Sequence, residues 1–493
     1  MLPRYSLLLP GLVLTAGLSI PMVSAQQPLR PEFLTTPEQR EALELAAVRG
    51  LDYIPGEVIV KFRLGTTGAG QTRALDALRS RPLPDRLQWI GDRTARLRVD
   101  GDLDSPAIAA TLSRQPEVEY AHPNWLLKKN LIPNDTSYAS RQWNLTAINM
   151  PGAWDVNSGA SGITVAVIDS GMTSVTATYG FKTWSGTAIV TDQMPFAISP
   201  DFDAARIATG RDFVFWTGPV LDSDGHGTHV AGTIAQTTNN NLGYAGVAYN
   251  AKVMPLKACL SYWDVQILRS EQGVTGYAPL GSDFCPTSAV VTAIRYAADN
   301  GAKVINLSIG GTNQSPSYVD ALNYAVSRGV FVAISAGNDF EDGNPTTYPA
   351  SYASTIQGAM SVGAVGRSLT RAFYSTSGSF VEVAAPGGNS RDGGSSGVIW
   401  QTGILFDDYD PEVIIFPRFD RYSDTGLQGT SMASPHVAGV AALLMSQGIT
   451  SPAAVEAAIA RSARDLGTKG RDNDFGAGLI EPRAALRGFG VVR

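Results

Sequence analysis

The stretch GITVAVIDSG, residues 162–171, decides how the larger part of this chain folds. Apolar residues run almost unbroken up to Asp169, which is typical of a strand buried in a parallel sheet. Three later stretches repeat the pattern and are expected strands: 251–258, 302–311 and 329–339. Helical spacing of apolar residues marks three other segments: 226–236, 286–301 and 317–329. The alternation of strands and helices predicts an α/β domain with a parallel sheet.

A different pattern precedes this domain. Strands are expected at 56–63, 118–125 and, as one or two strands, 87–99, with helices at 72–81 and 105–114. Ser105 is expected to cap the second helix. The order β-α-β-β-α-β is typical of a small ferredoxin-like α+β domain. Residues 126–135 are expected to form an exposed linker, and the α/β pattern begins at about Ile132.

Residues 1–25 have the form of a signal peptide. Arg4 precedes an apolar run, and Val23-Ser24-Ala25 has the small residues of a cleavage site, so we expect cleavage after Ala25. A membrane anchor is the alternative, but the run is short and prolines interrupt it. No later apolar stretch reaches about 20 residues, so we expect a secreted, soluble mature protein without a membrane partner.

Composition narrows the function further. The chain of 493 residues is 44% hydrophobic and 17% charged, which favours folded domains over disorder. Its net charge of −6 argues against nucleic-acid binding, which usually needs a basic face. Cys259 and Cys285 form an even pair, which in an exported protein indicates a disulfide, with two buried free thiols as the alternative.

Three side chains point to nucleophilic catalysis. Asp169 ends a strand, while His226 and Ser431 open helices, and active sites of parallel sheets gather at the carboxyl ends of strands. A serine hydroxyl needs a base within hydrogen-bond reach, and a carboxylate fixes the tautomer of that imidazole. Ser431 also lies where free backbone N–H groups favour an oxyanion. Taken alone, without its surrounding motif, Ser431 would be interpreted as a helix cap rather than a nucleophile.

The surrounding motifs carry a family resemblance. DSG at 169–171, HGTHVAG at 226–232 and GTSMASPHVAG at 429–439 resemble, in this order, the three signatures of the subtilisin-like serine proteases (subtilases). The resemblance covers roughly residues 132–493 and is of the thermitase type. It implies a three-layer subtilisin-like domain in which Asp169, His226 and Ser431 form the triad.

The same resemblance assigns further residues. SAGND at 335–339 is similar to the family segment whose asparagine donates to the oxyanion, which implies this role for Asn338. The strand that pairs with substrate backbone would be Ser308, Ile309 and Gly310. The pocket for the residue at the scissile carbonyl would be built by Ala336, Gly337 and Thr347. Thr347 stands where some relatives have glycine, which leaves the depth of that pocket open.

Calcium sites are also implied by the resemblance. Residues 133–143 look like the start of a thermitase-type mature enzyme, so Asp135 is a candidate ligand. Asp201 and Asn240 fill the companion positions, and backbone carbonyls would come from Thr237, Leu242 and Tyr244. An all-oxygen set with two carboxylates suits Ca²⁺ as a structural ion.

The resemblance also gives the first domain a role. Residues 26–131 look like a subtilase propeptide, a folding chaperone and transient inhibitor of residues 132–493. Self-cleavage is expected within about 126–134. The partners are then peptide substrates and the chain's own propeptide, and the mature enzyme is expected to be a monomer.

Two short motifs in the sequence are compatible with other kinds of hydrolase. Gly393–Gly397 fits the G-x-S-x-G esterase elbow, but it lies in a Gly/Ser-rich loop rather than between a strand and a helix. His229 and His436 are expected to be structural, since no glutamate accompanies the HGTH pair as in zinc proteases.

Two other classes of protein compete with an active secreted protease. One is a non-catalytic binding protein on a subtilase scaffold, and the other is an enzyme that never sheds its propeptide. Three long insertions, 172–200, 259–285 and 391–425, have no predicted role.

Overall fold

The computed structural model describes residues 36–49, 51–78, 87–99, 104–126, 132–405 and 418–488, so the predicted signal peptide lies outside the described residues. The chain divides into two compact units, Met1–Lys128 and Lys129–Arg493. Each unit has a hydrophobic core of its own.

The second unit is built on a seven-stranded sheet in which the paired strands are parallel. Its strands, in spatial order, are β13 (Val383–Pro386), β12 (Ala359–Val365), β11 (Phe331–Ser335), β10 (Val304–Leu307), β5 (Thr164–Asp169), β9 (Lys252–Lys257) and β8 (Arg211–Asp212). This sheet confirms the parallel α/β prediction. The predicted strands all lie within it, each a few residues shorter than its apolar run.

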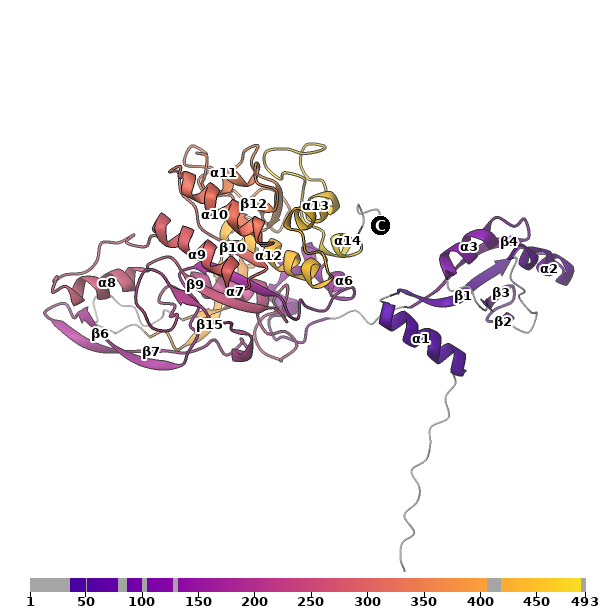
Figure 1. Cartoon of the computed structure of the whole chain (residues 1–493), viewed down its shortest axis with the longest axis horizontal. Coiled ribbons are helices and arrows are strands. Elements are labelled where there is room, and N and C mark those ends of the chain that lie inside the picture. Colours follow the sequence, from indigo (N-terminus) through magenta and orange to yellow (C-terminus); the bar gives the residue numbers. More distant parts are fainter. Residues whose placement is uncertain are drawn as a thin grey trace, which may run out of the picture. The chain divides into compact units, whose positions relative to one another are not determined.

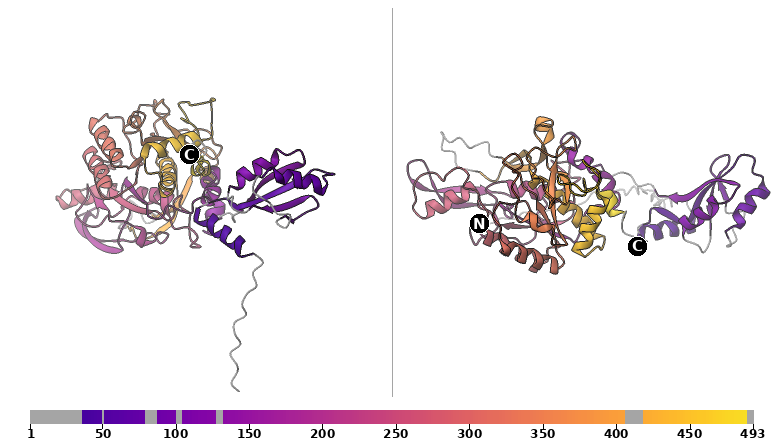
Figure 2. Two further views of the ribbon diagram at one scale, coloured as in Figure 1. Left: turned by 45° about the vertical axis from the view of Figure 1, so that its right-hand side comes forward. Right: turned by 90° about the horizontal axis from the view of Figure 1, so that it is seen from above.

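Helices cover both faces of this sheet, because successive side chains of a strand point to opposite faces. Val165 and Val167 of β5 pack into a core shared with α7 (His226–Ala235) and α12 (Thr430–Ser446). Ala166 and Ile168 pack into a second core with α9 (Thr287–Asp299) and α10 (Pro316–Ser327). The result is three layers, which Figures 1 and 2 show from three directions.

Shorter helices complete this unit. They are α4 (Tyr138–Arg141), α5 (Trp143–Ala147), α6 (Met150–Trp154), α11 (Ala350–Ala353), α13 (Pro452–Ser462) and α14 (Pro482–Leu486). No helix among the described residues is long and apolar enough to cross a membrane.

The three insertions form structured additions to the sheet. β6 (Ala177–Trp184) and β7 (Ile189–Phe196) make a hairpin that lies against α8 (Tyr262–Glu271) at one end of the unit (Figure 1). An aromatic cluster that includes Phe196 and Phe419 fills the space beneath the hairpin. β14 (Ile399–Ile404) and β15 (Tyr422–Leu427) pair as a second hairpin, whose connection at 406–417 lies outside the described residues.

The first unit has the predicted order of elements after an additional helix, α1 (Pro37–Arg49). These elements are β1 (Tyr53–Phe62), α2 (Gly68–Asp76), β2 (Leu87–Trp89), β3 (Thr94–Arg98), α3 (Ser105–Ser113) and β4 (Val118–Trp125). The antiparallel sheet has the order β2-β3-β1-β4, which is that of a ferredoxin-like domain. Segment 87–99 therefore forms two strands.

Two local predictions in this unit were wrong. The helix expected at 72–81 begins earlier, at Gly68, because Thr67 accepts a hydrogen bond from Gly70 N and caps it. The cap of α3 is Asp104, whose Oδ1 accepts from Ala107 N at 3.1 Å. The Ser105 hydroxyl instead donates to the Ile54 carbonyl.

Candidate active site

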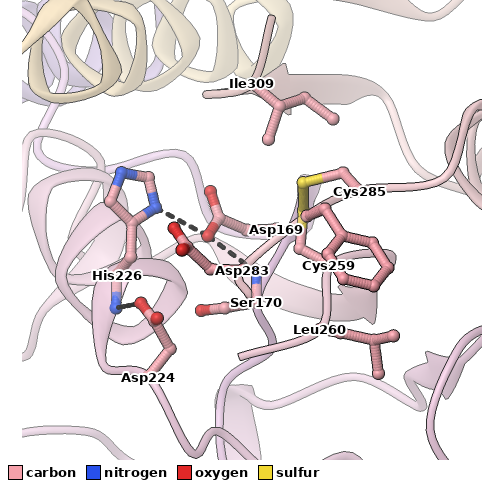
Figure 3. Close-up of a pocket in the computed structure, with 10 residues that line it drawn as sticks. Asp169, Ser170, Asp224, His226, Cys259, Leu260, Asp283, Cys285 and Ile309 are labelled. Atoms are coloured by element: carbon pink, nitrogen blue, oxygen red, sulfur yellow. Dashed lines mark hydrogen bonds and ion pairs between the residues drawn. A yellow bond between two sulfur atoms is a disulfide. The ribbon is translucent and has the colours of Figure 1, made fainter. Parts of the chain in front are cut away.

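The Asp169 carboxylate and the His226 imidazole form a hydrogen-bonded pair (Figure 3). Asp169 ends β5 and His226 begins α7, and Oδ1 of the aspartate lies 2.7 Å from Nδ1 of the histidine. Ser170 N also donates to Oδ1, at 2.7 Å. A proton held on Nδ1 by the carboxylate leaves Nε2 free to accept one, which is the state a general base requires.

Close backbone packing brings α7 to the end of β5. A Cβ atom on Gly227 would lie only 2.1 Å from the Gly171 carbonyl oxygen, so this approach requires glycine. Asp222 fixes the first turn of the helix, because its buried carboxylate accepts from Gly225 N, Thr228 N and the Thr228 hydroxyl. Asp222 is not among the residues predicted from the sequence, although an aspartate just before a helix is an ordinary capping signal.

The charges around His226 favour its protonated form. Partial burial of the imidazole opposes protonation, but Asp169, Asp224 and Asp222 outweigh it and raise the pKa of His226 to about 9. The Asp224 carboxylate is held close by a hydrogen bond that it accepts from His226 N, at 3.0 Å. The site is therefore suited to stabilise an imidazolium.

Ser431 lies in the first turn of α12 and is tied to the segment after β10. Its hydroxyl donates to the Ser308 carbonyl at 3.1 Å, and the Ser308 hydroxyl donates to the Ser431 carbonyl at 2.7 Å. Pro435, four residues on, has no N–H for that carbonyl, so the Ser308 hydroxyl takes the place of the missing helical donor. Among the described contacts, Ser431 and His226 share no hydrogen bond. His226 is placed by α7 at the end of β5, and Ser431 is placed by α12 against the segment after β10, the parallel neighbour of β5.

Asn338 is oriented by the same helix. Its Oδ1 accepts from both the backbone N–H and the hydroxyl of Thr430, each at 2.9 Å. This arrangement leaves its Nδ2 group without an acceptor among the described residues. The Ser431 N–H, at the start of α12, likewise has no described acceptor, as expected for the first turn of a helix. Two hydrogen-bond donors, Asn338 Nδ2 and the Ser431 N–H, are therefore available at the N-terminus of α12.

The predicted substrate-binding residues lie on three segments: the one after β10, the one after β11 and the one just before α11. They are Ser308, Ile309, Gly310, Ala336, Gly337 and Thr347. The Thr347 side chain fills the space between two glycines. A Cβ atom added to Gly337 would lie 2.4 Å from Thr347 Oγ1, and one added to Gly310 would lie 2.8 Å from Thr347 Cγ2. Thr347 is buried, so it limits the room between these segments.

The predicted calcium ligands gather around one loop. Asp201 Oδ1 accepts from Asn240 Nδ2 at 2.7 Å, its Oδ2 accepts from Tyr244 N at 3.0 Å, and its carbonyl accepts from Thr237 N. Leu242 N donates to Asn240 Oδ1. Asp135 Oδ2 accepts from Asn239 N, while its other oxygen, Oδ1, is buried without a described partner. An unpartnered buried carboxylate oxygen fits a set of oxygen ligands for a hard cation.

A disulfide joins Cys259 and Cys285 and stands beside the Asp169–His226 pair. Between them lies a cavity of about 200 Å³ (Figure 3). Its walls come from β5, α7, the segment after β10 and both ends of the 259–285 insertion. No local sequence pattern predicts this cavity, because the disulfide and the sheet together assemble it.

The two other histidines of this unit are structural, as expected. Burial lowers the pKa of His229 to about 3 and that of His436 to about 4, so both rings are neutral. His436 Nδ1 contacts the Met432 carbonyl and its Nε2 contacts Asn144 Nδ2.

No group of three or more His, Cys, Asp or Glu side chains in the described part of the chain could hold a metal ion. An esterase elbow is excluded too, because β14 rather than a helix follows Gly394–Gly397.

A parallel α/β sheet with an Asp–His pair, a serine in the first turn of a helix and free donors beside it defines a serine hydrolase. Comparison with known proteins gives the family. The model of the subtilase family matches residues 160–478, and that of the fervidolysin N-terminal prodomain matches residues 40–124. The chain belongs to the subtilase family; it is a serine endopeptidase with an N-terminal prodomain.

Individual relatives agree with this assignment. A thermophilic serine proteinase of Bacillus sp. (strain AK1) is 34% identical over 397 residues, which are 80% of this chain and 79% of the relative. Thermitase of Thermoactinomyces vulgaris is 34% identical over 352 residues, 70% of this chain and 98% of the relative. The fervidolysin structure from Fervidobacterium pennivorans has a TM-score of 0.50 at 24% identity, with 88% of this chain and 61% of that chain covered, and it supports the fold.

Proposed function

We propose that the chain is a secreted endopeptidase in which Ser431 is the nucleophile, His226 the general base and Asp169 the residue that orients it. In the first step His226 Nε2 takes the proton from Ser431 Oγ, which attacks the scissile carbonyl. The imidazolium then gives this proton to the leaving amine, and an acyl-enzyme remains. In the second half of the cycle His226 takes a proton from a water molecule, which attacks the acyl carbonyl, and then returns this proton to Ser431 Oγ as the acid product leaves. The observation that carries this proposal is the 2.7 Å Asp169–His226 bond at the start of α7, a helix that packs against α12, whose first turn contains Ser431.

Asn338 is proposed to hold the oxyanion together with the Ser431 N–H. The carbonyl oxygen becomes negative when Ser431 attacks, and donors fixed in advance stabilise this charge without reorganising. Thr430 anchors Asn338 through its Oδ1, so Nδ2 is the atom left to donate. A side-chain amide and a helix N-terminus would then act on one oxygen.

Substrate backbone is proposed to pair with Ser308, Ile309 and Gly310 as an added strand. The side chain at the scissile carbonyl would lie against Ala336, Gly337 and Thr347. Because the buried Thr347 side chain occupies the space beside Gly310 and Gly337, this pocket would be shallow and favour small side chains.

Maturation is proposed to follow from the two-unit organisation. Residues 1–25 would direct export, and residues 26–131 would assist folding and inhibit residues 132–493 until they are removed. The prodomain match at 40–124 supports this division. Cleavage within about 126–134 would fall where one compact unit ends, at Lys128, and the next begins.

Labelling with a fluorophosphonate tests the proposed nucleophile. This reagent phosphonylates serines that are activated by a base, so we expect one added group per mature chain and, by peptide mapping, its location on Ser431. Heat-denatured protein is the control and should stay unlabelled, because the base is then no longer close. A label on another serine, or none on protein that still cleaves peptides, would contradict the assignment.

Calcium is proposed as a structural ion held by Asp135, Asp201 and Asn240, with carbonyls of Thr237, Leu242 and Tyr244. The unpartnered Asp135 Oδ1 supports this set. A bound cation would offset the cost of burying two carboxylates near each other.

Chelation is expected to lower thermal stability. Excess EDTA should reduce Tm by roughly 5–10 °C, because an ion bound only by the folded state stabilises it in proportion to the logarithm of its concentration. The melt should be recorded on enzyme inactivated with the fluorophosphonate, so that autolysis does not contribute. Added Ca²⁺ should restore Tm and Mg²⁺ should not. An unchanged Tm in EDTA would remove the calcium assignment.

A further inference from the structure

The cavity beside His226 carries more negative charge than the catalytic steps require. Three carboxylates line it, from Asp169, Asp224 and Asp283. Asp169 is 1% exposed, and its Oδ2 has no hydrogen-bond partner. In Figure 3 this carboxylate lies between the His226 ring and the disulfide. Among the described residues, no lysine or arginine pairs with any of the three.

Asp283 comes from the 259–285 insertion and is fixed at the cavity by its neighbours. Phe284 and Leu260 exchange both backbone hydrogen bonds, at 2.9 and 3.2 Å. Cys285 is bonded to Cys259 directly beyond them. The Asp283 side chain is exposed, and in Figure 3 it points toward the His226 side of the cavity. The covalent and backbone pairing therefore holds a free carboxylate beside the catalytic pair.

Apart from Ser170 and His226, the remaining walls of the cavity are apolar. Leu260, Phe284 and Ile309 line it together with the disulfide. An apolar wall that ends in carboxylates matches a side chain with a methylene stem and a cationic end, as in lysine and arginine. The aromatic ring of Phe284 adds a face over which a cation can lie.

The position of the cavity selects one residue of the substrate. Successive side chains of an extended peptide point to opposite sides. If the residue at the scissile carbonyl faces Thr347 and Gly337, the residue before it faces the other way. That side is the one lined by Ile309 and His226, where the cavity lies.

We propose that this cavity is a specificity subsite for lysine or arginine at the residue preceding the one that supplies the scissile carbonyl, and that Asp283 is its specificity-determining residue. The inference rests on the proposed function, because it needs a peptide bound along residues 308–310. It gives the 259–285 insertion a role in substrate selection.

Paired peptides test the proposal. Two peptides of identical sequence carry lysine or methionine at this one position, and kcat/KM is measured for each at pH 9, with cleavage sites assigned by mass spectrometry. We expect the mature wild-type enzyme to prefer the lysine peptide by about three- to tenfold, and less at high salt because exposed charges are screened. Asp283→Asn should bring this ratio close to one. Asp283→Lys should make a glutamate peptide the better substrate.

The control variant is Asp320→Asn, an exposed aspartate on α10, which should keep the wild-type ratio. Equal cleavage of both peptides by the wild type, or an unchanged ratio in Asp283→Asn, overturns the inference and leaves the proposed function standing. Failure to cleave either peptide, with no fluorophosphonate label on Ser431, refutes the proposed function and the inference with it. Variants that still take up the label are folded, so a changed ratio in them reports selectivity.

Discussion

Replacing Ser431 by alanine is expected to reduce kcat/KM for peptide hydrolysis by a factor on the order of 10⁶. The substitution removes the atom that attacks the carbonyl, and the remaining oxyanion donors and binding contacts supply only a small residual acceleration. The same variant should keep its propeptide. Intact mass and N-terminal sequencing of the secreted protein check this: the wild type should begin within about residues 126–134, and Ser431→Ala should begin after Ala25.

The matched control is Ser462→Ala, which removes a hydroxyl whose hydrogen bonds, among the described residues, go to the preceding turn of α13. It should mature and cleave as the wild type does. If Ser431→Ala loses its propeptide like the wild type, another protease processes the chain. A wild-type start upstream of His122 would contradict cleavage at the junction of the two units, and full activity in Ser431→Ala would contradict its role as nucleophile.

Replacing Asp169 by asparagine is expected to lower kcat by about 10⁴. The amide can occupy nearly the same space, but it no longer enforces the tautomer with the proton on Nδ1. It also lacks the charge that stabilises the imidazolium. Rates measured with a peptide ester and a peptide amide should show the larger loss of kcat for the amide, because its leaving group needs the proton from His226.

The pH profile separates this electrostatic role from a structural one. His226 must be neutral to act as a base, so kcat/KM is lost as the pH falls through its pKa, which is raised to about 9 in the wild type. Asp169 is the first of the charges that raise it, so the acidic limb of kcat/KM should move to lower pH in Asp169→Asn. Asp320→Asn should leave the limb in place. An unmoved limb in Asp169→Asn would contradict the assigned charge effect.

The three layers of the α/β unit follow from the sequence because their signal is local. In β5, Val165 and Val167 face one core while Ala166 and Ile168 face the other, so an apolar run is required whatever the neighbouring strands are. Asp169, His226 and Ser431 could be found for a related reason. Each lies at the end of a strand or the start of a helix, and the surrounding motif marks that boundary.

Details of the prodomain helices were less predictable. Ser105 and Asp104 are both good capping residues, and only the backbone angle at the helix start decides between them. The serine hydroxyl is taken by the Ile54 carbonyl, on a strand far away in the sequence. Competition of this kind leaves no trace in local residue patterns.

The order of elements, the parallel class of the sheet and the residues at the carboxyl ends of its strands, where catalysis is proposed, could all be predicted from the sequence. Tertiary structure alone decided which distant groups meet there. The exchange between Ser308 and Ser431 spans 123 residues, and the Cys259–Cys285 link sets Asp283 beside His226. The physical reason is that periodicity and capping report the environment of one segment, whereas these contacts depend on strand order, a covalent cross-link and the close approach of backbones at Gly227.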